Sequence, residues 1–165
     1  MMPDYPKWLP FIVSVDGLWE DILKRLYAIF EQDFKKTKRM LWKMEVWWDR
    51  TIRKEVGYEE GFLHLIEREE LSTGERLFDP RRAERLPWCG PTISNVDDVA
   101  VKAWYWLSAK RRMRVYLWLE NFDYVIVLEK KQLRIRDVAF LVTAFYVDGP
   151  SKRRDLQRKY DERLQ

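Results

Sequence analysis

From about residue 100 onward, apolar and polar residues alternate with a period of two, and this pattern constrains the fold more than any other feature. Such alternation is typical of strands, because successive side chains of a strand point to opposite faces of a sheet. The predicted strands are VAVKAWYWLS, MRVYLWLE, YVIVLEKK and VAFLVTAFYVD, with a hairpin across ENFD. The last strand is the most apolar and is expected at the centre of the sheet. The second half of the chain therefore predicts an antiparallel meander.

A helix is predicted ahead of this meander, in GLWEDILKRLYAIFEQDFKK, because its apolar residues recur at helical spacing. Asp16 is its expected N-cap. The following MLWKMEVWWDRTIRK alternates for part of its length and favours a strand. The stretch 57–74 is ambiguous. If FLHLIE is extended, Phe62, His64 and Ile66 share one face.

Two further helices are predicted around the meander. DPRRAERLPW matches a short helix with Asp79 as its cap and Pro80 at its first position. The stretch 87–91, which has a proline at each end, is expected to be irregular. After the last strand, Ser151 begins a C-terminal helix. One narrow stripe of that helix is predicted to be buried: Leu156, Tyr160 and Leu164.

This order of elements predicts an α+β protein. N-terminal helices precede a small antiparallel β-sheet, and a C-terminal helix follows it. At 165 residues the chain is most simply one domain. Within it, residues 1–15 are expected to form an extended arm, residues 16–54 the N-terminal helix and tryptophan-rich strand, and residues 55–163 the core.

The distribution of charge is more informative than its sum. The formal net charge is only +4, too small to indicate a nucleic-acid partner by itself. Basic residues cluster in the second half, at 81–85, 110–114, 130–131 and 152–154. A single cluster is usually a solvated face, but four around one predicted sheet favour an anionic nucleic acid as partner.

The cysteine content and the apolar runs indicate where the protein works. Cys89 is the one cysteine, which excludes an intramolecular disulfide, and it is expected to be a packed thiol. No signal peptide is recognised, and no apolar run is long enough to span a bilayer. The expectation is a cytoplasmic protein that does not enter the membrane.

The chemistry-bearing residues favour acid–base chemistry without a cofactor. One histidine and one cysteine do not build a typical zinc site, and CGPTISN lacks the glycines and the lysine of a phosphate loop. No metal or cofactor is therefore expected. Cleavage of RNA suits this inventory, because RNA carries its own 2′-hydroxyl nucleophile. The enzyme then needs a base, an acid and cations for the phosphorane-like transition state.

Three residues are the candidates for this chemistry. His64 is the candidate acid or base, and Arg68 lies on its face whether the segment is extended or helical, so both can reach one phosphate. Thr143 is a lone hydroxyl on an apolar strand, expected on the face of Leu141 and Phe145, where it would orient the phosphate. The alternatives are structural: a partly buried histidine and a β-branched strand residue.

The segments EEGFLHLIERE, RRAERLPWCGPTISN, YVIVLEKK, LVTAFYVD and KRRDLQRKY, in this order, resemble phage- and prophage-associated nuclease-like domains of the barnase–EndoU–colicin–RelE superfamily. The resemblance covers roughly residues 55–163. It implies helices before a small antiparallel sheet, and cleavage of RNA without metal to leave a cyclic phosphate. It also implies that His64 and Thr143 are the catalytic histidine and threonine, and that Arg68 binds phosphate together with Arg82 or Arg85.

The chain departs from a two-histidine mechanism, because it has no second histidine. The acid–base partner of His64 stays open among Glu67, Glu129 and Tyr146, and Tyr146 is also a candidate substrate-binding residue. The leading hypothesis is a metal-independent endoribonuclease, toxin-like or phage-derived, with an inhibitor or antitoxin protein as a further partner. The alternative is a non-catalytic module that binds RNA or protein through an aromatic and basic surface.

Overall fold

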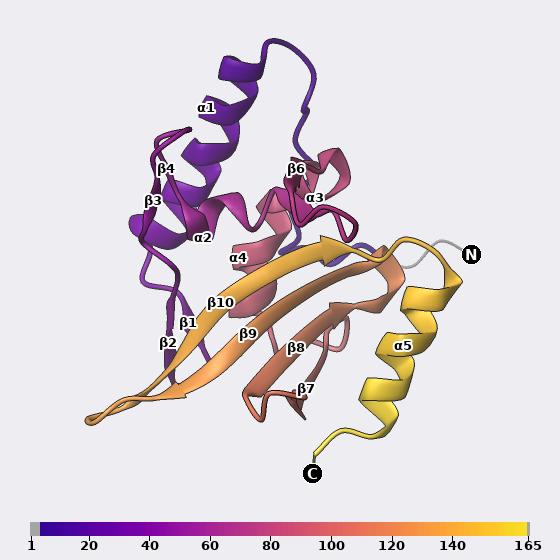
Figure 1. Cartoon of the computed structure of the whole chain (residues 1–165). Coiled ribbons are helices and arrows are strands. Elements are labelled where there is room, and N and C mark those ends of the chain that lie inside the picture. Colours follow the sequence, from indigo (N-terminus) through magenta and orange to yellow (C-terminus); the bar gives the residue numbers. More distant parts are fainter. Residues whose placement is uncertain (1–3, 165) are drawn as a thin grey trace.

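The central element of the fold is a curled six-stranded sheet (Figure 1). We describe the structure from a computed structural model, for residues 4–164. The strand order is β1-β2-β10-β9-β8-β7. Its long strands are β7 (Lys102–Leu107), β8 (Met113–Leu119), β9 (Tyr124–Gln132) and β10 (Asp137–Tyr146). They form the predicted antiparallel meander, and the short helix η2 (Glu120–Phe122) turns the β8–β9 hairpin. The most apolar strand, β10, is one of the two central strands, as predicted.

The α+β class is confirmed, but the expected small antiparallel sheet is wrong. The tryptophan-rich segment forms a hairpin, β1 (Met40–Leu41) and β2 (Met44–Trp47), in place of one strand. Trp42 takes a φ of 51° in the turn between them. β2 then pairs parallel with β10, which makes the sheet mixed. A parallel pair needs a long crossover connection, so helices and hairpins lie between these two strands and do not simply precede the sheet.

The N-terminal helix is confirmed, with a different beginning. α1 (Trp19–Phe30) has Leu18 as its N-cap residue and no side-chain cap, so the role predicted for Asp16 is wrong. A π-helical turn, η1 (Glu31–Lys35), continues it. Two small hairpins follow η1 and the β1–β2 hairpin. They are β3 (Ile52–Arg53) with β4 (Tyr58–Glu59), and β5 (Glu67–Glu69) with β6 (Arg76–Phe78).

The structure resolves the ambiguous stretch around His64 and corrects the prediction for the stretch 87–91. FLHLIE is not extended, because α2 (Glu60–Leu63) makes one helical turn there and His64 follows it as the C-cap. The stretch 87–91 is not irregular, because α4 (Leu86–Ser94) passes through it. Pro87 is tolerated in that helix because it lies in the first turn, where the missing N–H has no partner to lose.

The two helices predicted before and after the meander are confirmed. α3 (Pro80–Glu84) is capped by Asp79, whose Oδ1 accepts hydrogen bonds from the backbone N–H groups of Arg81 at 3.0 Å and Arg82 at 3.3 Å. α5 (Pro150–Asp161) follows the last strand, and Leu156 is its one buried residue. Leu164 lies beyond its end, half exposed. Within residues 4–164, no helix has the length and apolar character needed to cross a bilayer.

Apolar side chains pack on both faces of the sheet. The larger cluster joins one face to α1, α2 and α4. The smaller cluster joins Trp104, Tyr116, Trp118 and Val125 on the opposite face to Leu156 of α5. Figure 1 shows α5 alone on that side of the sheet. A single helix covers little of this face, and a hollow lies beside it.

Candidate functional site

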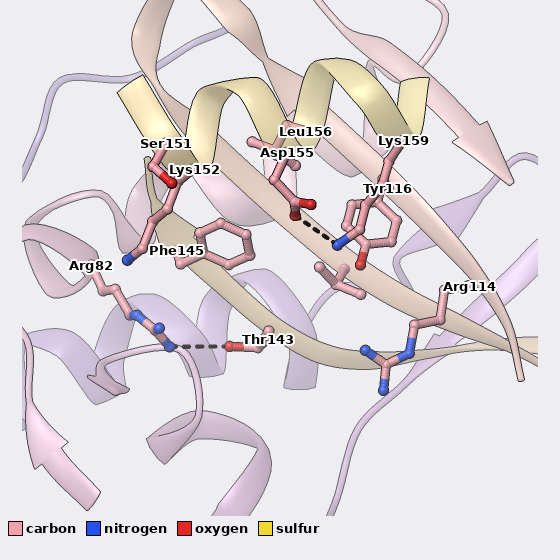
Figure 2. Close-up of a pocket in the computed structure, with 11 residues that line it drawn as sticks. Arg82, Arg114, Tyr116, Thr143, Phe145, Ser151, Lys152, Asp155, Leu156 and Lys159 are labelled. Atoms are coloured by element: carbon pink, nitrogen blue, oxygen red, sulfur yellow. Dashed lines mark hydrogen bonds and ion pairs between the residues drawn. The ribbon is translucent and has the colours of Figure 1, made fainter. Parts of the chain in front are cut away.

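The hollow beside α5 has a volume of about 510 Å³ and lies between the sheet and that helix (Figure 2). Side chains of β8, β9 and β10 form its floor, α5 forms a wall, and a side chain from α3 reaches it from the other side. We call it the basic hollow. It is lined by Arg82, Arg114, Tyr116, Val127, Thr143, Phe145, Ser151, Lys152, Asp155, Leu156 and Lys159.

Positive charge dominates the basic hollow, since four cationic side chains face one carboxylate. That carboxylate, Asp155, is already neutralised by Lys159 at 3.0 Å and by Arg158 at 2.9 Å. Lys152 is exposed at the first turn of α5 and has no ion-pair partner among the described residues. The electrostatic potential in this hollow therefore favours an anion.

Among these cations, Arg114 gives the strongest indication of a bound anion. Glu129 faces it across the β8–β9 pair, yet Glu129 makes its ion pair with Arg112, at 3.8 Å. Within the part of the chain that the structure describes, Arg114 has no ion-pair partner, and its Nε is buried without an acceptor. A desolvated donor without an acceptor costs free energy. The Nε of Arg82 is in the same state, so two guanidinium groups of this hollow have donors to offer an anionic ligand.

Arg82 is held in place by a network of contacts. Its Nη1 donates to the carbonyl of Glu67 at 2.5 Å and to the hydroxyl of Thr143 at 3.2 Å, and its Nε lies 3.6 Å from Oδ2 of Asp79. The hydroxyl of Thr143 donates in turn to the carbonyl of His64, at 3.1 Å. Burial lowers the pKa of Arg82, but an arginine stays cationic at neutral pH. Arg82 is thus a positioned cation at one end of the hollow.

A β-bulge directs Thr143 into the hollow. Leu141 pairs with Leu128, but the next pair along is Thr143 with Val127, so β10 has one extra residue at this point. A bulge reverses the alternation that follows it. Leu141 consequently packs in the larger core, while Thr143 and Phe145 line the basic hollow on the other face. The prediction that Thr143 shares a face of the sheet with Phe145 is confirmed. The prediction that it shares this face with Leu141 is wrong.

The imidazole of His64 lies in a different environment. It is 34% exposed, and its Nε2 is 3.5 Å from Oε2 of Glu60. Arg53 ion-pairs with Glu60 at 2.7 Å and with Glu67 at 2.9 Å, beside the same ring. Burial, and then the charge of Arg76, lower the pKa of His64, so the ring is neutral at neutral pH. His64 is not among the residues that line the basic hollow; its carbonyl, and not its ring, contacts Thr143.

A second hollow, of about 750 Å³, adjoins the first and is lined by three of the predicted residues: Arg68, Arg82 and Tyr146. The two hollows share Arg82 and Lys152. Four cations and four carboxylates balance one another in the second hollow. It is lined by Arg68, Glu69, Glu70, Leu71, Asp79, Pro80, Arg81, Arg82, Tyr146, Asp148 and Lys152. The half-exposed Arg68 pairs weakly with Glu70, at 3.4 Å.

The structure therefore brings the predicted residues together in small groups and not as one constellation, and Arg68, Arg82 and Tyr146 share the second hollow. Arg82 joins Thr143. Arg85 lies over the ring of Tyr146, with 4.4 Å between its guanidinium carbon and the ring centre, and ion-pairs with Glu84.

Of the candidate acid–base partners, Glu67 ion-pairs with Arg53 and Arg76, and Glu129 is buried beside Arg112. Sequence reasoning missed Arg114, Lys152 and Tyr116 as individual residues. The basic clusters at 110–114 and 152–154 were the signal for the first two.

Comparisons of this chain with protein-family models, with curated proteins and with solved structures found no match. The resemblance to nuclease-like domains stays a prediction. Among residues 4–164, no three histidine, cysteine, aspartate or glutamate side chains gather as a metal site would require. Cys89 is buried, and burial raises the pKa of its thiol.

Proposed function

We propose that this protein binds RNA through phosphate groups held in the basic hollow. The observation that carries the proposal is the guanidinium of Arg114, which shares the hollow with Arg82 and Lys152. Within residues 4–164, neither Arg114 nor Lys152 has an ion-pair partner. Guanidinium groups donate well to phosphate oxygens, because their planar fork matches two oxygens at once. The hydroxyl of Ser151 adds a further donor at the same place.

Aromatic side chains support RNA over a small inorganic anion. Phe145 and Tyr116 line the same hollow as the cations, and Figure 2 draws the Phe145 ring between Arg82 and α5. Aromatic rings beside a positively charged groove favour unpaired bases, which stack on them. A volume of about 510 Å³ has room for a nucleotide unit in addition to its phosphate.

Cleavage of RNA by the endoribonuclease mechanism is a further prediction with less support from the geometry. Arg82 and Arg114 would stabilise the transition state. The proposed acid or base, His64, is not a lining residue and its ring contacts Glu60, so binding is favoured over catalysis. An inhibitor protein and a cytoplasmic location likewise stay predictions from the sequence.

Titration of a fluorescently labelled single-stranded RNA tests the binding, with salt varied between about 50 and 200 mM. We expect affinity to fall as salt rises, and Arg114→Gln to weaken binding by about tenfold. Arg134→Gln is the matched control: it removes the same charge from an exposed position in the turn between β9 and β10. Wild-type binding no tighter to RNA than to polyglutamate of equal charge would refute the proposal.

The same samples test cleavage. Incubation of the protein with RNA in excess chelator, followed by gel analysis, reports metal-independent cleavage. If the endoribonuclease hypothesis holds, RNA is cut to products with cyclic phosphate ends, and His64→Ala abolishes cleavage while RNA binding is retained. If the protein binds the RNA but leaves it intact, the endoribonuclease hypothesis is refuted and the protein is a binding module.

A further inference from the structure

The positive charge of the basic hollow continues on one side of the hollow and ends on the other. On the side of Arg82 and Lys152 it meets the second hollow, where four carboxylates balance four cations. Past Arg114, the turn 108–112 between β7 and β8 carries three consecutive basic residues. A chain of phosphates is therefore attracted on one side of the hollow and not on the other.

The first turn of α5 adds to this local field. Ser151 and Lys152 belong to that turn and line the basic hollow. No side chain caps the helix, whose N-cap residue is Gly149 with a φ of 90°. The uncapped N-terminus of a helix bears a partial positive charge, which stabilises a nearby anion. It adds to the cations of the hollow at the end where the second hollow begins.

We propose that the basic hollow binds the phosphate-bearing end of an RNA strand, with the remainder of the strand leaving past Arg114 toward the turn 108–112. This end-binding rests on the RNA binding proposed above. A terminal phosphomonoester carries a charge of about −1.5 to −2 at neutral pH, whereas an internal phosphodiester carries a single negative charge. In the same field the terminal group gains about twice the Coulomb energy.

The geometry fits one highly charged group better than a continuous backbone. Arg82, Arg114 and Lys152 surround a single hollow, and its one carboxylate is already ion-paired. Proteins that follow a nucleic-acid backbone spread their cations along a groove. Here the excess of positive charge ends at the second hollow, where cations and carboxylates balance, and that is where a strand would end.

The test uses the full-length protein and three RNAs of identical sequence: one with a 5′-phosphate, one with a 3′-phosphate, and one with hydroxyl groups at both ends. We expect one phosphorylated RNA to bind at least about tenfold more tightly than the hydroxyl-ended RNA. Arg114→Gln and Lys152→Gln should each reduce that preference. Arg154→Gln, at an exposed position of the same helix, should keep it. Circular dichroism of each variant verifies folding.

Each other result overturns the inference in a distinguishable way. Equal affinity for all three RNAs removes end-binding and leaves the proposed RNA binding standing. Failure of every RNA to bind removes both. A preference for a phosphorylated end that survives in folded Arg114→Gln and Lys152→Gln proteins assigns the terminal phosphate to another surface, and also overturns the inference.

Discussion

Replacement of Arg114 by methionine should separate binding from stability. The methionine keeps the apolar stem of the side chain and removes a guanidinium that has no ion-pair partner among the described residues. A charge-assisted hydrogen bond to phosphate contributes roughly 1.5–3 kcal/mol, so RNA affinity should fall by about tenfold to a hundredfold. The slope of log affinity against log salt should shrink by about 0.7, the value for one phosphate contact on a single strand.

The free energy of unfolding should respond in the opposite sense. Because the buried Nε of Arg114 has no acceptor within residues 4–164, its removal should leave stability unchanged or raise it by up to about 1 kcal/mol. Arg82→Met is the contrasting variant. It loses the hydrogen bonds to the carbonyl of Glu67 and the hydroxyl of Thr143, and should cost about 2–4 kcal/mol.

Urea unfolding followed by tryptophan fluorescence measures both changes in stability, and RNA titration measures the change in affinity. A loss of more than about 1 kcal/mol in Arg114→Met would identify Arg114 as a structural residue. Unchanged RNA affinity in that variant would remove it from the binding site.

Three further predictions concern the surroundings of the hollow. Leu156→Ala should cost about 2–5 kcal/mol in urea unfolding and weaken RNA binding, because Leu156 is the one buried residue of α5, whereas Leu164→Ala at a half-exposed position should do neither. The pKa of His64 is lowered by burial and then by Arg76, so its contribution to stability is complete above the unfolded value of 6.5 and lost as pH falls from there toward the folded pKa. Unfolding measured between about pH 8 and pH 5 should show this loss in wild type and not in His64→Gln. Asp79→Ala should cost about 0.5–2 kcal/mol in thermal unfolding through loss of the α3 cap, while Asp79→Asn retains most of it.

Local patterns were sufficient for most individual elements. The period of two in the second half of the chain predicts β7 to β10, and the Asp79-Pro80 pair predicts α3, because each depends on residues that are close in sequence. The class of fold follows from the order of such elements. Where prediction failed in the stretch 87–91, the burial of Trp88, Cys89 and Gly90 in α4 outweighed the local signal.

The candidate site was only partly accessible to sequence reasoning. The basic clusters gave the correct regions, and Arg82 and Thr143 were named. Arg114 was not singled out, because a guanidinium is notable only when its neighbours leave it unpaired. The imidazole of His64 was expected to lie beside Thr143. The structure instead places the backbone carbonyl of His64, at the end of the helical turn α2, in contact with the Thr143 hydroxyl.

The sequence by itself determined an α+β protein with a central apolar strand, a capped short helix and a basic second half. Only the tertiary structure decided that β2 joins β10 in parallel, that a bulge turns Thr143 to the face under α5, and that Glu129 pairs with Arg112 and leaves Arg114 free among the described residues. The physical reason is the range of the interactions. Helix and strand propensities act between neighbours in the chain, whereas strand register and ion pairing depend on which distant residues the fold brings within a few ångströms.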